Sequence, residues 1–291
     1  MILFLVISRL INEVIELKNI GMLSIKGKVR ENDEDSILCV TLKRGGGNSD
    51  TAGLFCALAD GMGGGERGEI ASSLAINVAS KYSTDLILGS SLDENLIKDK
   101  MMKIVEESND EIKKYRKEHN IENMGTTLTA ALILKDQLFV VNIGDSRTYL
   151  IASDGKIRKK TKDHSYVQEL VDNGFLTEDK IRDHPKRNLV TRIIDGEIGN
   201  FADFYHWQIF KGDTVLLCCD GFWEPLSDEF IGKSLSSDED PQLIAESMAE
   251  LANDIDGSDN ISLIIIKPDI QLNEKEYVES KTVKFEKKMG N

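Results

Sequence analysis

Residues 53–68 read Gly-Leu-Phe-Cys-Ala-Leu-Ala-Asp-Gly-Met-Gly-Gly-Gly-Glu-Arg-Gly, an apolar run that ends in an aspartate and a cluster of glycines. The run has the length of a buried strand, and residues 69–82 after it have the apolar spacing of a helix. Gly63, Gly65 and Gly68 also match the G-x-G-x-x-G pattern of dinucleotide-binding folds. This segment alone leaves the fold open, so the sequence on either side must decide it.

Two features argue against a dinucleotide site. Asp60 ends the apolar run, where its charge would repel a pyrophosphate. Downstream apolar runs are separated by only a few residues, such as 135–136 and 144–147, which suits antiparallel hairpins and is too short for crossover helices. The alternative is that the glycines let a carboxylate and backbone carbonyl groups approach a metal ion closely.

The hydrophobic pattern predicts a β-rich body with helices kept apart from the strands. Strands are expected at residues 36–42, 53–59, 127–134, 137–143, 148–152, 204–210, 214–219 and 261–266. Helices are expected at residues 69–82, 92–117, 227–235 and 241–251, the last with Asp240 as N-cap and Pro241 in the first position. Hairpin-linked strands with segregated helices predict a layered α+β sandwich.

The composition limits the classes of protein and partner. The chain has 291 residues, 41% hydrophobic and 30% charged, with a formal net charge of -14 at pH 7. These values exclude a disordered or collagen-like chain. The hydrophobic fraction is large enough for a buried core, and the length suits one or two domains. Acidic surface residues explain most of the charge, which argues against nucleic acid or an anionic membrane as partner. A phosphorylated partner would need local cations.

The cysteines and the N-terminal segment bear on the compartment. Four cysteines lie in apolar runs without C-x-x-C spacing, namely Cys39, Cys56, Cys218 and Cys219. They predict buried free thiols in a reducing cytosol rather than disulfides or a zinc site. The apolar residues 1–7 are too short to span a bilayer, and no other stretch is long enough. Residues 1–18 are expected to form an amphipathic helix that packs on the body or contacts a partner or membrane surface.

Aspartates recur at the ends of the expected strands. They are Asp35, Asp60, Asp145, Asp220 and Asp259. Each one alone is best explained as a turn residue, but strand ends of a sandwich can converge, and clustered carboxylates repel unless cations lie among them. Oxygen ligands without nearby Cys or His favour Mg²⁺ or Mn²⁺ over Zn²⁺. Arg30 either forms a surface salt bridge with a neighbouring glutamate or projects toward this cluster to bind a phosphate.

Eight short stretches, taken in order, resemble the motifs of the type 2C, metal-dependent (PPM) Ser/Thr protein phosphatases, and in particular their bacterial branch. These stretches are residues 27–35, 59–64, 125–127, 142–147, 163–165, 188–192, 217–221 and 259–262. They span residues 20–268 in the family's order. The resemblance implies an αββα sandwich of two antiparallel sheets flanked by helices, with a metal site at one end.

The resemblance also implies which residues hold the two metal ions of the core site. Asp60 would bridge the two ions, and the Gly61 carbonyl would bind one of them. Asp220 and Asp259 would be ligands of the other. Asp60, Asp220 and Asp259 are therefore the catalytic residues that the resemblance implies.

Further residues follow from the same resemblance. Asp145 would hold a third, weaker metal ion, and Asp35, or Glu34 beside it, would bind metal directly or through water. Arg30 would clamp the substrate phosphate. Residues 165–200 match a mobile flap whose sequence varies with the substrate.

The implied activity is hydrolysis of phosphoserine and phosphothreonine with Mn²⁺ or Mg²⁺, by direct attack of a water that bridges the two metal ions. Met62 stands where some family members have a histidine, so water is expected to supply the proton to the leaving group. The alternative is a catalytically weak or inactive pseudophosphatase that serves as a regulatory binding module.

The expected partner is a phosphoprotein, such as a target of a bacterial Ser/Thr kinase. The enzyme is expected to be a cytoplasmic monomer with no transmembrane segment and no nucleic-acid partner. Its expected organisation is an N-terminal extension at residues 1–18, a phosphatase domain at residues 19–268 and a charged tail at residues 269–291.

Overall fold

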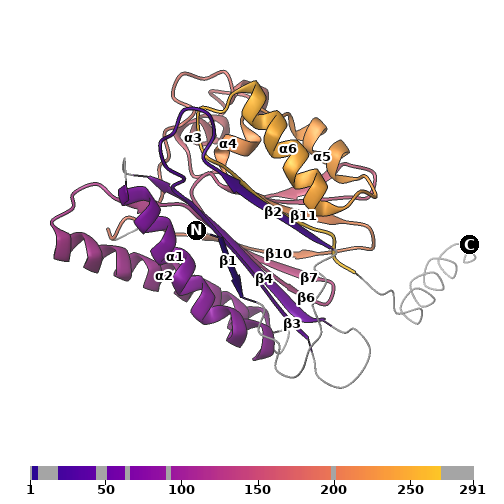
Figure 1. The fold of residues 1–291 in the computed structure, drawn as a ribbon, viewed down its shortest axis with the longest axis horizontal. Coiled ribbons are helices and arrows are strands. Elements are labelled where there is room, and N and C mark those ends of the chain that lie inside the picture. The colour runs from indigo at the N-terminus through magenta and orange to yellow at the C-terminus, as the bar shows by residue number, and fades with distance from the viewer. Residues whose placement is uncertain are drawn as a thin grey trace, which may run out of the picture.

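The strands of the protein form two stacked sheets (Figure 1). The computed structural model describes residues 2–5, 19–43, 51–62, 66–89, 93–197 and 201–269. The first sheet runs in the order β1 (Ile2–Leu5), β3 (Asp35–Lys43), β4 (Thr51–Met62), β6 (Leu128–Leu134), β7 (Gln137–Ile143) and β10 (Asp203–Gln208), and β5 (Gly125–Thr126) also pairs with β4. The second runs in the order β2 (Ile20–Ile25), β12 (Ile261–Ile266), β11 (Thr214–Cys218), β8 (Arg147–Ile151) and β9 (Ile157–Lys160). Neighbouring strands pair antiparallel, except that β1 runs parallel to β3.

Helices cover the outer faces of both sheets (Figure 1). The first sheet carries α1 (Glu66–Leu88) and α2 (Glu94–His119), and the second carries α5 (Asp228–Leu235) and α6 (Pro241–Ile255). Directly after β11 comes α4 (Asp220–Trp223), while α3 (Tyr166–Asp172) and a 3-10 helix (Glu178–Lys180) lie in the connection between β9 and β10. This order of helix, sheet, sheet and helix confirms the expected α+β sandwich.

Capping residues set where two of these helices begin. The Asp240 carboxylate accepts a hydrogen bond of 2.8 Å from the Gln242 amide, and Pro241 takes the first helical position as expected. The Asp93 carboxylate accepts a bond of 3.0 Å from the Asn95 amide at the start of α2. Both side chains satisfy amide groups that have no partner inside the helix.

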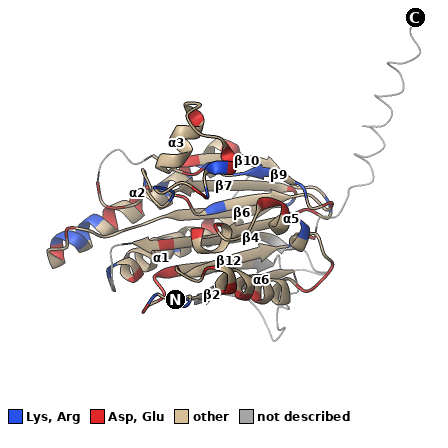
Figure 2. Cartoon of the chain, turned by 90° about the horizontal axis from the view of Figure 1, so that it is seen from above, with Lys and Arg blue, Asp and Glu red and all other residues tan. Residues whose placement is uncertain are grey.

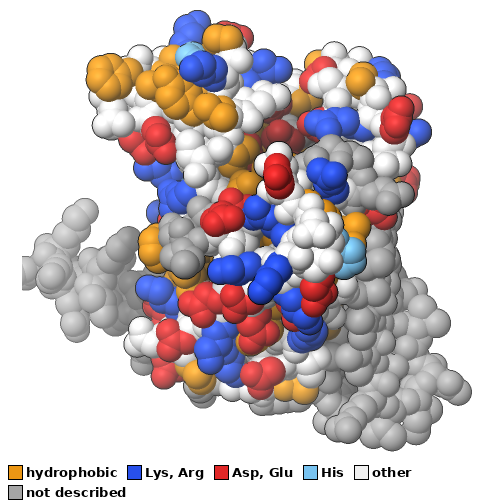
Figure 3. Space-filling view, turned by 90° about the vertical axis from the view of Figure 1, so that its left-hand side faces the viewer, with side chains coloured by type: hydrophobic (Ala, Val, Ile, Leu, Met, Phe, Trp, Pro, Cys, Tyr) orange, Lys and Arg blue, Asp and Glu red, His pale blue; other side chains and the backbone are white. Residues whose placement is uncertain are grey.

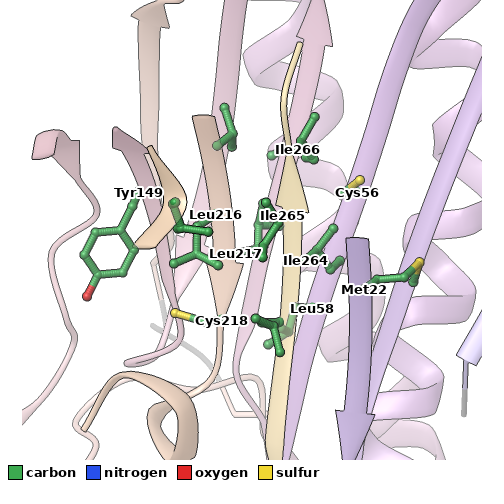
Figure 4. Close-up of a cluster of buried hydrophobic side chains, with 14 of the residues drawn as sticks. Met22, Cys56, Leu58, Tyr149, Leu216, Leu217, Cys218, Ile264, Ile265 and Ile266 are labelled. Atoms are coloured by element: carbon green, nitrogen blue, oxygen red, sulfur yellow. The ribbon is translucent and has the colours of Figure 1, made fainter. Parts of the chain in front are cut away.

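The core has one layer of buried side chains between the two sheets and one layer between each sheet and its helices. Along β4, Cys56 and Leu58 point into the layer between the two sheets, whereas Phe55 and Ala57 point into the layer beneath α1 and α2. Figure 4 shows Cys56 and Leu58 near Ile264 of the second sheet. Because both faces of β4 are buried, its sequence is a continuous apolar run rather than an alternating one.

All eight expected strands are present, and the described residues form four further strands that are not predicted by the sequence. Two of these have clear physical reasons. Gly21 weakens the strand pattern of β2, but a Cβ there would lie 2.0 Å from the Pro241 carbonyl oxygen, so α6 packs on it only if it is glycine. The strand β9 reads Ile-Arg-Lys-Lys, which is the charged composition of a sheet edge.

The N-terminal prediction is wrong for its first residues, because residues 2–5 form a strand on β3 instead of a helix. Residues 6–18 and the tail at 270–291 lie outside the described residues, so those predictions stay untested. All four cysteines are buried free thiols, as expected. Among the described helices, none combines the length and apolarity needed to cross a bilayer.

Candidate metal centre

The predicted acidic residues come together at one end of the sandwich. Asp35 begins β3 and lies directly opposite Asp60, near the end of β4. Asp145 lies in the turn between β7 and β8, Asp220 follows β11, and Asp259 precedes β12. Seen from this end, the surface is hollowed between two lobes, and acidic side chains lie in the hollow (Figure 3). Five segments that are distant in the sequence therefore supply one cluster.

Burial and neighbouring charges raise the pKa values of Asp35, Asp60 and Asp220. Burial raises the pKa of Asp60 well above its usual range, and the charges of Asp35, Asp220, Asp145 and Asp259 raise it further. Burial and the neighbouring Asp259 raise the pKa of Asp220 to about 7. Burial is also the main cause that raises the pKa of Asp35 to about 8. Carboxyl groups this close together are stabilised when they take up protons or when cations bind among them.

Two threonines fix the position of Asp60. The Asp60 carbonyl accepts hydrogen bonds of 2.9 Å from the Thr127 amide and from the Thr126 hydroxyl. In return, the Asp60 amide donates to the Thr127 hydroxyl at 3.0 Å. This explains why the stretch Gly125-Thr126-Thr127 accompanies the aspartate, and it leaves the Asp60 carboxylate to point into the cluster.

Two glycines next to the aspartates allow backbones to touch. A Cβ on Gly61 would lie 2.1 Å from the Gly68 carbonyl oxygen and 2.6 Å from that of Glu34. A Cβ on Gly221 would lie 2.1 Å from the carbonyl oxygen of Asn260. Gly61 and Gly221 thus serve close backbone approach, whereas Gly63 and Gly65 lie outside the described residues and the expected approach of the glycines to a metal ion stays a prediction.

Arg30 lies at the cluster, as expected, and contacts Asp259. Its Nη2 atom is 2.6 Å from Asp259 Oδ2, and its Nη1 atom is 3.8 Å from Glu34 Oε2. The Arg30 side chain is 44% exposed, so the guanidinium can be reached from solvent. The structure therefore contains both the predicted glutamate contact and a stronger contact with the cluster.

Asn260 is a scaffold residue that the sequence does not reveal. Its side-chain amide donates to the carbonyl oxygens of Lys26 at 3.0 Å and Asn32 at 2.9 Å, and its side-chain oxygen accepts from the Glu34 amide at 2.9 Å. Asn260 is buried and adjacent to Asp259. It therefore ties the loop that carries Arg30 to the segment before β12 that carries Asp259, and only the three-dimensional contacts identify this role.

A second scaffold holds Asp145. The Trp223 indole donates a 3.0 Å hydrogen bond to the Asp145 carbonyl oxygen, and the Arg147 guanidinium lies 3.3 Å from the centre of the Trp223 ring. Arg147 also forms two bonds with Asp163, at 2.8 and 2.6 Å. All four residues are buried. Burial and the charges of neighbouring aspartates raise the pKa of Asp145.

The donor chemistry of the cluster fits a hard cation. Its members are all oxygen donors, and Asp220 Oδ1 is buried without a hydrogen-bond partner among the described residues. Within the described part of the chain, however, no three acidic, imidazole or thiol side chains already converge on one point. A cation would therefore also need a backbone carbonyl or water, and Asp259 would have to turn away from Arg30.

The segment predicted as a flap leaves the body of the protein and returns to it next to Asp145. At its base, Ser165 pairs with Val190, and the Tyr166 amide donates to the Leu189 carbonyl oxygen at 2.8 Å. The His164 amide bonds to the carbonyl oxygen of Gly144, next to Asp145. We call residues 165–197 the flap, because residues 198–200 lie outside the described part of the chain.

Comparisons with known proteins identify relatives of this chain. Residues 45–256 match the family model for protein phosphatase 2C. The serine/threonine protein phosphatase PstP of Mycobacterium tuberculosis is 36% identical over 83% of this chain, and the chain spans 43% of that relative's length. The serine/threonine phosphatase stp of Listeria innocua is 32% identical, and the match covers 76% of this chain and 90% of the Listeria protein.

A solved structure adds a metal to the comparison. The crystal structure of the catalytic domain of PstP in complex with two manganese ions is 33% identical, covers 84% of this chain and 96% of its own, and has a TM-score of 0.69. The motifs, the sandwich and these relatives lead to one conclusion. This chain belongs to the protein phosphatase 2C family.

Proposed function

We propose that this protein is a metal-dependent phosphatase that hydrolyses phosphoserine and phosphothreonine in proteins. The main support for the proposal is the convergence of five aspartates from distant strand ends, where burial and the neighbouring carboxylates raise the pKa values of Asp60 and Asp220. A cluster of this kind is unfavourable unless cations offset it, and Mn²⁺ or Mg²⁺ suits its oxygen donors. The activity of the bacterial relatives supports the same proposal.

Two ions would occupy the core of the cluster. Asp60 would bridge them, the Gly61 carbonyl would bind one, and Asp220 and Asp259 would bind the other. Ions bound there would lower the pKa of a coordinated water and offset the negative charge of the phosphoryl group. The threonine bonds to the Asp60 backbone would hold the bridging carboxylate in place.

Other residues would support the site from its rim. Asp35, with Glu34 beside it, would bind metal directly or through water, and Asp145 would bind a third ion. The 2.6 Å contact of Arg30 with Asp259 has a consequence for the substrate. Once a cation takes Asp259, the guanidinium would be released to clamp the phosphate, because its planar fork fits two phosphoryl oxygens. Met62 cannot give a proton, so water would protonate the leaving oxygen.

The proposed partner is a protein that a Ser/Thr kinase has phosphorylated. The phosphatase domain would comprise residues 19–268 and would act as a single chain. The four buried free thiols favour the reducing cytosol as its location.

The test is phosphate release from a phosphothreonine peptide and from p-nitrophenyl phosphate. Turnover should require Mn²⁺ or Mg²⁺, stop with EDTA and fail in Asp60→Asn. The exposed Asp154→Asn serves as the matched control and should keep full activity. Turnover that persists in EDTA would refute the proposal, and a wild-type protein without turnover would favour the binding module.

A further inference from the structure

A groove separates the edge strands of the two sheets. β9 and β10 are the last strands of their sheets, and a cavity of about 500 Å³ lies between them. Figure 2 shows the two strands side by side, with basic residues on β9. The walls of the cavity include Arg158, Lys159, Phe204, Tyr205, Trp207 and Phe210. This groove is lined by aromatic rings and cations and contains none of the acidic residues of the metal centre.

Backbone groups on both sides of the groove are available for pairing. Within the described part of the chain, β9 pairs only with β8, and β10 pairs only with β7. The opposite edge of each strand therefore presents N–H and C=O groups that an extended chain can bind. The groove suits a polypeptide in β conformation better than a compact small molecule.

The cations of the groove define the charge of such a chain. The Arg158 guanidinium lies 4.7 Å from the centre of the Phe210 ring and 3.4 Å from Asp213 Oδ1, so two neighbours hold it in place. Lys159 is exposed and forms no ion pair with a described residue. On a chain with a net charge of -14, this is a local positive rim that favours an acidic segment.

One end of the groove meets the base of the flap. The Tyr205 hydroxyl accepts a hydrogen bond from the Lys162 amide and donates one to Asp203, both at 3.1 Å. Asp203 Oδ1 in turn lies 3.5 Å from Arg192 at the end of the flap. A chain that lies in the groove therefore extends toward the carboxylate cluster.

We infer that the groove between β9 and β10 binds an acidic, extended segment of the phosphoprotein substrate, away from the phosphorylated residue itself. This inference rests on the proposed phosphatase function, because it names a docking site for that substrate. It predicts that affinity for the substrate depends on residues that do not touch the phosphate.

The experiment measures binding and turnover in the same proteins. A fluorescein-labelled peptide of about ten residues that alternates Glu with Val, the length of an extended strand, is titrated with the full chain. A peptide with Lys in place of Glu is the control. The test variant is Arg158→Glu/Lys159→Glu, and the matched variant is Lys81→Glu/Lys103→Glu, two exposed residues on α1 and α2 with the same charge change. Turnover of p-nitrophenyl phosphate reports on the metal centre separately.

The inference predicts that the acidic peptide binds and the basic one does not. The groove variant should weaken binding about tenfold, since two attractive contacts become repulsive, while the matched variant and p-nitrophenyl phosphate turnover stay unchanged. The inference would be overturned if both peptides bind equally or neither binds. It would also be overturned if both double variants lose the same amount of affinity for the acidic peptide. If the double variant unfolds by circular dichroism, Lys159→Glu carries the test, because Lys159 has no ion pair to lose. Absent turnover in wild type would instead refute the phosphatase proposal.

Discussion

Asp35 and Asp60 lie directly opposite each other in the register of β3 and β4. Cross-strand partners project to the same face of a sheet, so the two carboxyl groups are held near each other by backbone pairing. Like charges in this position are destabilising, and burial adds to the cost. Repulsion between these carboxylates should therefore lower the stability of the metal-free protein.

The pH dependence of stability follows from these raised pKa values. Asp220 has a folded pKa of about 7 against an ordinary value of about 4, so the folded state binds more protons between these pH values. This group therefore stabilises the fold below the unfolded pKa, and its contribution falls as pH rises toward the folded one, by about 1.4 kcal/mol per pH unit at most. Urea unfolding in EDTA measures the free energy of unfolding at pH 5 and at pH 7. Between these pH values it should fall less for Asp220→Asn than for the wild-type protein. An identical loss in both proteins would contradict the prediction.

Arg30→Ala should raise KM more than it lowers kcat. The guanidinium is proposed to bind the phosphate already in the ground state, and losing such a charged hydrogen bond should raise KM about tenfold. Steady-state kinetics with a phosphothreonine peptide measure both constants. Lys28→Ala, in the same loop and paired with Asp254 instead, is the control and should leave both unchanged. A loss in kcat alone would argue against the clamp.

Asn260→Ala should lower the free energy of unfolding by about 2 kcal/mol, because it leaves the Glu34 amide without its partner and frees two carbonyl groups. Denaturant unfolding measures this loss. Asn32→Ala is the matched control, since the Asn32 side chain is exposed and the loop uses only its carbonyl oxygen. If both variants are equally stable, the scaffold role of Asn260 is wrong.

Trp223→Phe should shift the concentration of Mn²⁺ needed for activity. The phenyl ring can still lie against Arg147, but it cannot donate to the Asp145 carbonyl oxygen. The loss of that bond should cost about 1 kcal/mol and loosen the turn that carries Asp145. The activity toward p-nitrophenyl phosphate, which is too small to need the groove, should therefore require a higher Mn²⁺ concentration for half-saturation. Trp207→Phe, on β10, is the control for this small substrate. An unchanged half-saturation point would show that Trp223 does not position Asp145.

The sequence predicts the site residues better than it predicts what holds them. The five aspartates can be found because each one interrupts the pattern at the end of an apolar strand, and the family resemblance orders them. Asn260 and Trp223 cannot be found this way, since their roles depend on contacts with Glu34 and Asp145 that are distant in the sequence.

The missed strands have a similar cause. The pattern of β2 contains Gly21, which disfavours a strand locally but admits the backbone of α6 at Pro241. The charged strand β9 belongs to a sheet only because β8 lies beside it. Tertiary contacts therefore override local preference at the edges of the sheets and not in their centre.

A calorimetric titration of the metal-free protein with Mn²⁺ tests whether the carboxylate cluster is the metal centre. We predict that the wild-type chain binds at least two ions and that Asp60→Asn loses this binding, while Asp154→Asn retains it. Loss in the Asp60 variant should coincide with loss of phosphate release. If the wild-type chain binds no Mn²⁺, or if Asp60→Asn binds as many ions as wild type, the carboxylate cluster is not the metal centre.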